Sequence, residues 1–328
     1  MVRTILSLAL TLPLAAQTVR VVQTNSAGDA AQLIDPATNK VVLTIPNVEA
    51  VHGVNFSPDG RTTYFTVEGD STVKAVETKT GKMLGSVKLT GHPNNIAVSK
   101  DGKYVFAAIA VAPGALDVID TATMKNIKSI PVKGAVHNTY VTPDGKYVVA
   151  GSVGGLILQV FDSATFAPAW ELKMDKGVRC MAFETAADGS TARIFVQLSD
   201  VHGFAVVDFK THKEAQRVIL PDQPHTGVVH SGAPSHGVNV TADGKTLLVD
   251  SSVAQGVFFY SLPDLKNLGF VRTGNTPDWI ATTPDSKQAY IAVAGENVVS
   301  VLDIATRKET TRIPVGEVPK RNGTVVIR

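Results

Sequence analysis

Seven polar residues recur along the chain at almost constant spacing, and together they could form one chemical site. Successive members are 42 or 43 residues apart, except for a single step of 57 residues. Six of the seven can ionise, although Asp, Glu, Lys and Arg make up only 18% of the chain. The seven residues are His52, Asn94, His137, Arg179, His236, Asp278 and Lys320.

Three histidines of this set, His52, His137 and His236, could bind one metal ion if the fold brings them together. Imidazole suits copper, zinc and iron, and an open coordination position would leave room for a substrate. The intervals between these histidines are far longer than in any local metal motif, so the site depends entirely on the fold. The alternative interpretation is that these polar side chains only hydrate a channel or bond to nearby backbone.

The charged members of the set point to a second kind of chemistry. Arg179 and Lys320 could hold a carboxylate or a phosphate. With His137 or His236 as general base and Asp278 as the residue that orients it, such a group could open a lactone or eliminate a leaving group. The candidate catalytic residues are therefore His137, His236, Arg179 and Asp278.

A turn signal shows which elements position these residues. Five of these polar residues are followed, seven positions later, by an Asp. Each Asp lies in a tight turn between two segments in which apolar and polar residues alternate as in β-strands. We expect these aspartates to stabilise hairpins on the opposite face and not to bind calcium. The turns are Ser57-Pro58-Asp59-Gly60, Ser99-Lys100-Asp101-Gly102, Thr142-Pro143-Asp144-Gly145, Ala187-Asp188-Gly189, Thr241-Ala242-Asp243-Gly244 and Thr283-Pro284-Asp285-Ser286.

A second signal, an apolar residue followed by an acidic residue or Ser, marks the end of a third strand in every repeat. It occurs seven times, from Ile34-Asp35-Pro36 to Leu302-Asp303-Ile304, whereas the hairpin turn occurs six times. The chain therefore begins inside a repeat. We expect the last sheet to combine three N-terminal strands around Val19 to Ile45 with a C-terminal strand at 323–327, which closes a ring and removes exposed sheet edges.

The repeat resembles the YVTN-type (YncE-like) propeller family. The resemblance is carried by the run from Pro93 to Gly102 and by Ile119-Asp120-Thr121-Ala122-Thr123, and it extends over essentially the whole mature chain. It implies an all-β, seven-bladed β-propeller of four-stranded blades. It says little about function, because similar propellers include binding modules, lactonases, metal-dependent lyases and domains of redox enzymes.

In a propeller of this kind, the seven spaced residues would form a ring at one mouth of the central channel. The loops that carry His92, His202, His225 and His230 belong to the same face, whereas His212 belongs to the other. The Pro-, Gly- and His-rich insert at 220–234 is expected to form a lid or rim there. The predicted ligand-binding residues are Asn94, Arg179, Lys320, His225 and His230.

The N-terminus predicts export. A positive start at Arg3 precedes a short apolar run and small residues, as in a secretory signal peptide covering 1–16, and a single propeller domain would cover 17–328. The apolar run is too short to span a membrane. A periplasmic or extracellular protein whose one cysteine is Cys180 cannot form an internal disulfide, and we expect Cys180 to act as a small buried hydrophobe.

Three functions remain open on the sequence alone. The first is a propeller that binds a small ligand, with a divalent transition metal such as copper, zinc or iron, at the His-rich mouth. The second is a hydrolase or lyase acting on a small cyclic or anionic substrate at that site, and the third is a scaffold for protein partners. A net charge of +2 without runs of one sign argues against nucleic acid, and the phosphate-loop and Gly-x-Ser-x-Gly motifs are missing from the sequence.

Overall fold

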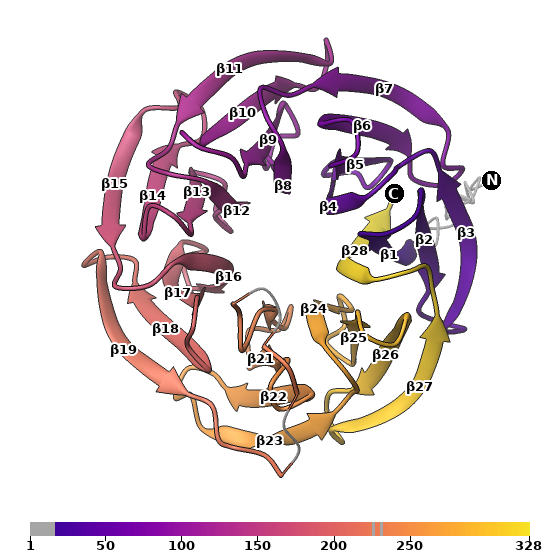
Figure 1. Ribbon diagram of the computed structural model, residues 1–328, viewed down its shortest axis with the longest axis vertical. Helices are drawn as coiled ribbons and strands as arrows, with labels where there is room; N and C mark the ends of the chain where they lie inside the picture. The colour runs from indigo at the N-terminus through magenta and orange to yellow at the C-terminus, as the bar shows by residue number, and fades with distance from the viewer. Residues whose placement is uncertain (1–16, 225–226, 230–231) are drawn as a thin grey trace, which may run out of the picture.

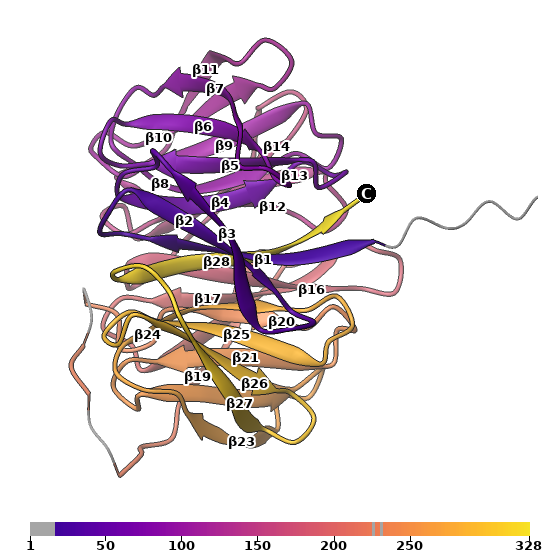
Figure 2. The same ribbon diagram turned by 90° about the vertical axis from the view of Figure 1, so that its right-hand side faces the viewer.

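The computed structural model describes residues 17–224, 227–229 and 232–328. In these residues, 28 strands form seven four-stranded antiparallel sheets, and no helix occurs among them. The sheets stand around a central axis like the blades of a propeller (Figures 1 and 2). The predicted all-β, seven-bladed propeller is confirmed. The predicted signal peptide at 1–16 lies outside the described residues, as do His225 and His230.

Each blade runs from the central channel to the rim, and blades one to six follow the order of the chain. The innermost strands of blades one to seven are β4 (Val51–Phe56), β8 (Pro93–Val98), β12 (Val136–Val141), β16 (Val178–Thr185), β20 (Val238–Val240), β24 (Pro277–Thr282) and β28 (Pro319–Ile327). The second strands are β5 (Thr62–Val67), β9 (Tyr104–Ile109), β13 (Tyr147–Ser152), β17 (Thr191–Leu198), β21 (Thr246–Ser251), β25 (Gln288–Val293) and β1 (Thr18–Asn25).

The remaining two strands of each blade complete the sheet. The third strands are β6 (Thr72–Glu77), β10 (Ala115–Asp120), β14 (Ile157–Asp162), β18 (Gly203–Asp208), β22 (Gly256–Ser261), β26 (Val298–Asp303) and β2 (Ala30–Asp35). The outermost strands are β7 (Met83–Lys88), β11 (Lys125–Pro131), β15 (Pro168–Lys173), β19 (Lys213–Ile219), β23 (Asn267–Arg272), β27 (Lys308–Pro314) and β3 (Lys40–Pro46).

The core is divided among the spaces between neighbouring blades. In the space between blades three and four, for example, Val149 and Leu158 pack against Val178 and Ile194. The second and third strands are buried along most of their length because a blade covers each face of the sheet. Packing of this kind stabilises the chain without a disulfide, and Cys180 is a free, buried cysteine.

Blade seven closes the ring with strands from both ends of the chain. Strand β28 pairs with β1 antiparallel, with Thr324 opposite Val21. The amide nitrogen of Asn322 also donates to the side chain of Gln23 at 3.1 Å. The predicted closure is confirmed, and β28 begins four residues earlier than expected, at Pro319. It therefore brings Lys320 and the following Arg321 to the channel.

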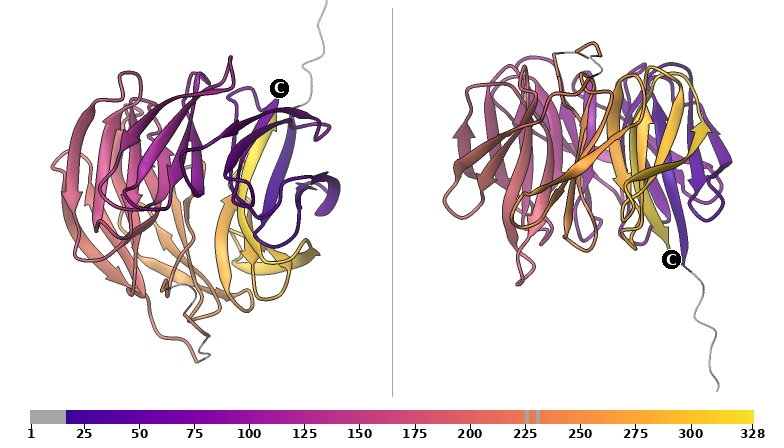
Figure 3. Two further views of the ribbon diagram at one scale, coloured as in Figure 1. Left: turned by 45° about the horizontal axis from the view of Figure 1, so that its top comes forward. Right: turned by 90° about the horizontal axis from the view of Figure 1, so that it is seen from below.

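The hairpin turns lie on the face that also carries the C-terminus, away from the insert (Figure 3). Gly60 shows why the turn needs its sequence. Its φ is +71°, and a Cβ there would lie 2.1 Å from the carbonyl oxygen of Val326. The carboxylate of Asp59 accepts from the hydroxyl of Ser57 and from the backbone N–H of Arg61, so it holds the turn together.

The turn aspartates make stability depend on pH. A Ser or Thr hydroxyl two residues before the Asp, and the backbone N–H two residues after it, lower the pKa of Asp59, Asp101, Asp243 and Asp285. A carboxyl whose pKa is lower in the folded protein stabilises it above about pH 4, and this stabilisation is lost as the pH falls through the folded pKa.

We therefore expect the four-site variant with these aspartates changed to asparagine to be less stable than the wild type at pH 7. Asparagine keeps an oxygen acceptor for the turn, so the change removes mainly the charge. Urea unfolding at pH 7 and pH 3 measures the effect, and the difference between the two proteins should shrink at pH 3. A difference that does not change with pH would show that these carboxylates contribute no acid sensitivity.

Candidate functional site

A β-bulge at the start of most innermost strands turns two consecutive side chains toward the channel. The pairing of these strands shifts register at this point, for example between Val136 and Asn138 and between Pro277 and Trp279. The seven predicted residues form the upper ring. The residues that follow them form a lower ring, which consists of Gly53, Asn95, Asn138, Cys180, Gly237, Trp279 and Arg321.

Members of the upper ring from neighbouring blades contact one another. The guanidinium of Arg179 lies 3.4 Å from Nε2 of His137. The Nδ1 atom of His236 lies 2.9 Å from the backbone oxygen of Asp278, and the carboxylate of Asp278 lies 3.3 Å from Nζ of Lys320. The rings of His137 and His236 are 5.5 Å apart and nearly perpendicular. Five predicted site residues therefore lie together at one end of the channel.

His52 is paired with a carboxylate that sequence analysis missed. Its Nδ1 contacts Glu68, which follows β5, and Nε2 of His92 lies 3.6 Å from the same carboxylate. The Nε2 atom of His52 is buried and has no hydrogen-bond partner among the described residues. Orientation of an imidazole by a carboxylate is the arrangement that a general base requires.

Arg321 fills the centre of the channel just below the upper ring. Its side chain is only 1% exposed. The guanidinium stacks on Trp279 at 4.1 Å from the ring centre and donates to the amide oxygen of Asn94 at 2.6 Å. When the amide of Asn138 is oriented to satisfy its neighbours, its oxygen also accepts from Arg321 at 3.0 Å. Asn94, a predicted ligand-binding residue, therefore positions this arginine.

Cys180 is buried, as expected, but its sulfur faces polar groups of the channel. The Sγ atom lies 3.6 Å from Nε2 of His236. One ligand atom from each of His137, Cys180 and His236 lies within 4.8 Å of the other two, and this is the one group of three such residues found in the described part of the chain. The structure thus brings two of the three predicted metal ligands together with Cys180, while His52 lies against Glu68.

Burial sets the protonation states at this mouth. Desolvation lowers the pKa of His236 to about 3, and it holds the pKa values of His52 and His137 well below the usual range. It also raises the pKa of the Cys180 thiol to about 12. The three histidines and the thiol are therefore neutral at pH 7 without a ligand.

Arg179 is the one residue of the two rings that lines a cavity between blades three and four, at the edge of this mouth. The cavity has a volume of about 320 Å³ and is also lined by Ser199, Asp200 and Gly232. The insert borders it, because the backbone oxygen of Gly232 accepts from the N–H of Asp200 at 3.0 Å. The described part of the insert therefore reaches the mouth, as a rim loop would. Figure 3 shows the described part of the insert on the face opposite the C-terminus.

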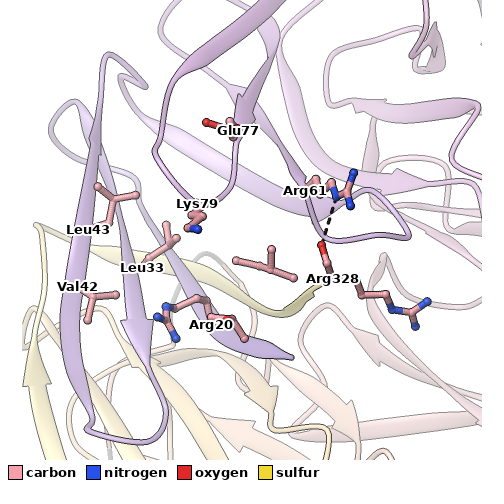
Figure 4. Close-up of a pocket in the computed structure, with 10 residues that line it drawn as sticks. Arg20, Leu33, Val42, Leu43, Arg61, Glu77, Lys79 and Arg328 are labelled. Atoms are coloured by element: carbon pink, nitrogen blue, oxygen red, sulfur yellow. Dashed lines mark hydrogen bonds between the residues drawn. The ribbon is translucent and has the colours of Figure 1, made fainter. Parts of the chain in front are cut away.

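Two other cavities were not anticipated. One, of about 460 Å³, occupies the lower channel beneath the rings, where Tyr140, Trp279 and Asn239 line it. The other, of about 570 Å³, lies on the opposite face between blades seven and one. It is lined by apolar side chains such as Leu33 and by the cations Arg20, Arg61, Lys79 and Arg328 (Figure 4).

The other histidines are dispersed. His202 lies beside blade five, where its Nε2 is 2.8 Å from the hydroxyl of Ser251. His212 stacks on Trp170 at 4.3 Å, with the two rings nearly parallel. None of the described residues forms a helix that is long and apolar enough to cross a membrane.

Comparison with known proteins places the chain among propellers without identifying its activity. The family model described as the cytochrome D1 heme domain matches residues 16–150, which is less than half of the chain. No curated protein matches. The YVTN-type assignment remains a prediction.

Several solved structures share the fold. The periplasmic gluconolactonase PpgL of Pseudomonas aeruginosa is 18% identical, with a TM-score of 0.77 and coverage of 95% of this chain and 100% of that one. Dihydro-heme d1 dehydrogenase NirN, in complex with DHE, is 19% identical, with a TM-score of 0.65 and coverage of 94% and 75%. Hydrazine synthase of Kuenenia stuttgartiensis is 19% identical, with a TM-score of 0.69 and coverage of 83% and 88%. At these identities the likeness shows the fold alone.

Proposed function

We propose that the protein is exported and binds a small anionic ligand, together with a divalent transition metal, at the His-rich mouth of its channel. The observation that carries this proposal is the position of Arg179. Its guanidinium lines the mouth cavity together with Asp200, and its Nε donates to the hydroxyl of Ser199 at 2.8 Å. A guanidinium in such a place can take a carboxylate or a phosphate through two parallel hydrogen bonds.

Two further cations strengthen the preference for an anion. Lys320, which is paired with Asp278, lies in the same ring as Arg179, and Arg321 lies beneath the ring in the channel. Neither lines the mouth cavity, but fixed charges in partly desolvated surroundings act on a ligand more strongly than charges in water. The family model is named for a heme domain and NirN was solved with DHE, so both support a ligand-binding use of this fold. The periplasmic PpgL supports export.

Tryptophan fluorescence can test anion binding, because the chain has two tryptophans in different places. Trp279 stacks on Arg321 at the site, whereas Trp170 stacks on His212. In the variant Trp170→Phe, Trp279 is the sole reporter. We expect titration with succinate or phosphate, at constant ionic strength, to change its emission in a saturable manner.

The matched control carries Arg20→Gln and Arg61→Gln in addition, which removes cations from the cavity of Figure 4 and should leave the titration unchanged. A signal that does not saturate, or one that disappears in this control, would contradict binding at the mouth.

A hydrolase or lyase is the second candidate function, and the His52–Glu68 pair favours it. The carboxylate orients Nδ1, and the buried Nε2 has no hydrogen-bond partner among the described residues, so it could remove a proton from water or substrate. Assay of a lactone such as glucono-1,5-lactone separates the two candidates. Turnover that is lost in His52→Gln, while anion binding persists, would favour the enzyme, whereas binding without turnover would favour the ligand-binding protein.

A further inference from the structure

We propose that Cys180, with His137 and His236, binds the transition metal, and that His52 is not one of its ligands. The inference rests on the proposed function and specifies its metal site. A thiolate with two imidazoles is a soft donor set that selects copper or zinc over magnesium, calcium or manganese.

The observed spacing fits a tetrahedral ion. With metal–sulfur and metal–nitrogen bonds of roughly 2.3 and 2.1 Å, the edge between a sulfur and a nitrogen ligand of a tetrahedron is about 3.6 Å. The Sγ of Cys180 and the Nε2 of His236 are 3.6 Å apart. The third ligand atom, from His137, is within 4.8 Å of both, so a modest rotation of one imidazole completes the set.

The surroundings of His236 already prepare it as a ligand. Its Nδ1 lies 2.9 Å from the backbone oxygen of Asp278, so Nδ1 carries the proton and Nε2 presents its lone pair to Cys180. A ring N–H donated to a backbone carbonyl is the usual support of a metal-bound histidine. The carboxylate of Asp278, 3.6 Å from the same ring, adds negative charge that favours a cation nearby.

Asn138 can orient His137 as a metal ligand, as the backbone oxygen of Asp278 does for His236. Its amide contacts Nδ1 of His137. With the amide oxygen turned toward that nitrogen, Nδ1 would donate the hydrogen bond, and Nε2, which lies 3.4 Å from the Arg179 guanidinium, would turn from that contact to the metal. The opposite orientation, which satisfies the neighbours of Asn138 in the structure, gives the oxygen to Arg321 and Tyr140. Metal binding by His137 would therefore require this amide to turn away from the arginine in the centre of the channel.

The fourth coordination position would be open toward Arg179. No fourth side chain joins the group of three in the described residues, and Arg179 lies 3.4 Å from His137 on the side of the mouth cavity. An anion held by Arg179 could therefore complete the coordination. His52 is excluded from the set because, in the described residues, it joins no such group with Cys180.

The experiment compares the mature wild-type protein with Cys180→Ser and His52→Gln. Each protein is stripped with chelator and titrated with Co²⁺, which reports on a zinc-like site, and in a second arm with Cu²⁺. Metal content after gel filtration gives the stoichiometry. A thiolate-to-metal charge-transfer absorption shows whether sulfur is a ligand, and this readout requires no activity. Circular dichroism confirms that each variant is folded.

We expect one equivalent of metal and the charge-transfer absorption in both wild type and His52→Gln. Cys180→Ser should lose the absorption and bind metal at least roughly 100-fold more weakly. Retention of metal by Cys180→Ser with loss in His52→Gln would overturn the proposal in favour of the three histidines, and a wild type without stoichiometric metal would overturn it altogether. The anion titration of Trp170→Phe in chelator tests the proposed function separately, so the two failures can be distinguished.

Discussion

Replacement of Arg321 by alanine is expected to lower the free energy of unfolding by about 3 kcal/mol. The change removes the largest fully buried side chain of the described residues from the centre of the channel. It leaves a cavity beneath the upper ring, exposes one face of Trp279 and removes the donor to Asn94. Urea unfolding at pH 7, followed by circular dichroism, measures the loss.

Arg321→Met separates the charge from the volume. Methionine fills much of the same volume and keeps an apolar contact with Trp279, but it cannot donate to Asn94. We therefore expect Arg321→Met to lose less stability than Arg321→Ala and yet to bind succinate or phosphate more weakly. If it is as unstable as the alanine variant, the charge itself is needed for folding. If it binds anions as well as the wild type, Arg321 is not part of the ligand site.

The double variant Arg179→Met, Lys320→Met is expected to bind anions at least about 100-fold more weakly in the Trp170→Phe titration. Two charge-assisted hydrogen bonds contribute about 1.5–3 kcal/mol each, and 1.4 kcal/mol corresponds to tenfold in affinity. Both cations lie in the upper ring, one on each side of the His137–His236 pair.

The control for this variant must retain the partner of Asp278, because this carboxylate is buried and Lys320 lies 3.3 Å from it. Arg179→Lys, Lys320→Arg keeps both charges and should lose far less affinity than the methionine pair. If both double variants lose the same anion affinity, the substitutions disturb the mouth in general. If the methionine pair binds anions as well as the wild type, Arg179 and Lys320 do not bind the anion.

The upper ring could be predicted because the repeat fixes it. The 42-residue spacing and the turn aspartates place residues such as His137 and Arg179 at equivalent points of successive blades, and a closed propeller must then bring them to one mouth. The closing strand was predictable for a similar reason, since the missing innermost strand had to come from the other end of the chain.

The lower ring could not be predicted, because a strand pattern of period two assigns the next residue to the opposite face. The bulge breaks that pattern and turns Asn138, Cys180 and Arg321 into the channel. Glu68 lies beyond the end of its strand, and no repeat signal marks its approach to His52. Pro-, Gly- and His-rich composition did indicate a rim loop in the insert, whose described end borders the mouth cavity.

The proposed metal set illustrates the same point. Residue type and spacing along the chain favour His52, His137 and His236 as metal ligands, since all three lie in the upper ring. Which of these histidines could bind a metal depends on their local contacts. In the structure His52 contacts Glu68, whereas Nε2 of His236 faces the sulfur of Cys180 in the lower ring. A ligand set of this kind can be found only when both rings are seen together.

A crystal of the mature protein soaked in selenate would test the central claim most directly, because anomalous scattering from selenium locates the anion without any assumption about the natural ligand. We predict a peak in the mouth cavity within hydrogen-bond distance of Arg179, with Lys320 and Arg321 nearby. A strong peak confined to the cations of the opposite face, such as Arg20 and Arg61, with none at the mouth, would contradict the proposal that the His-rich mouth binds an anion.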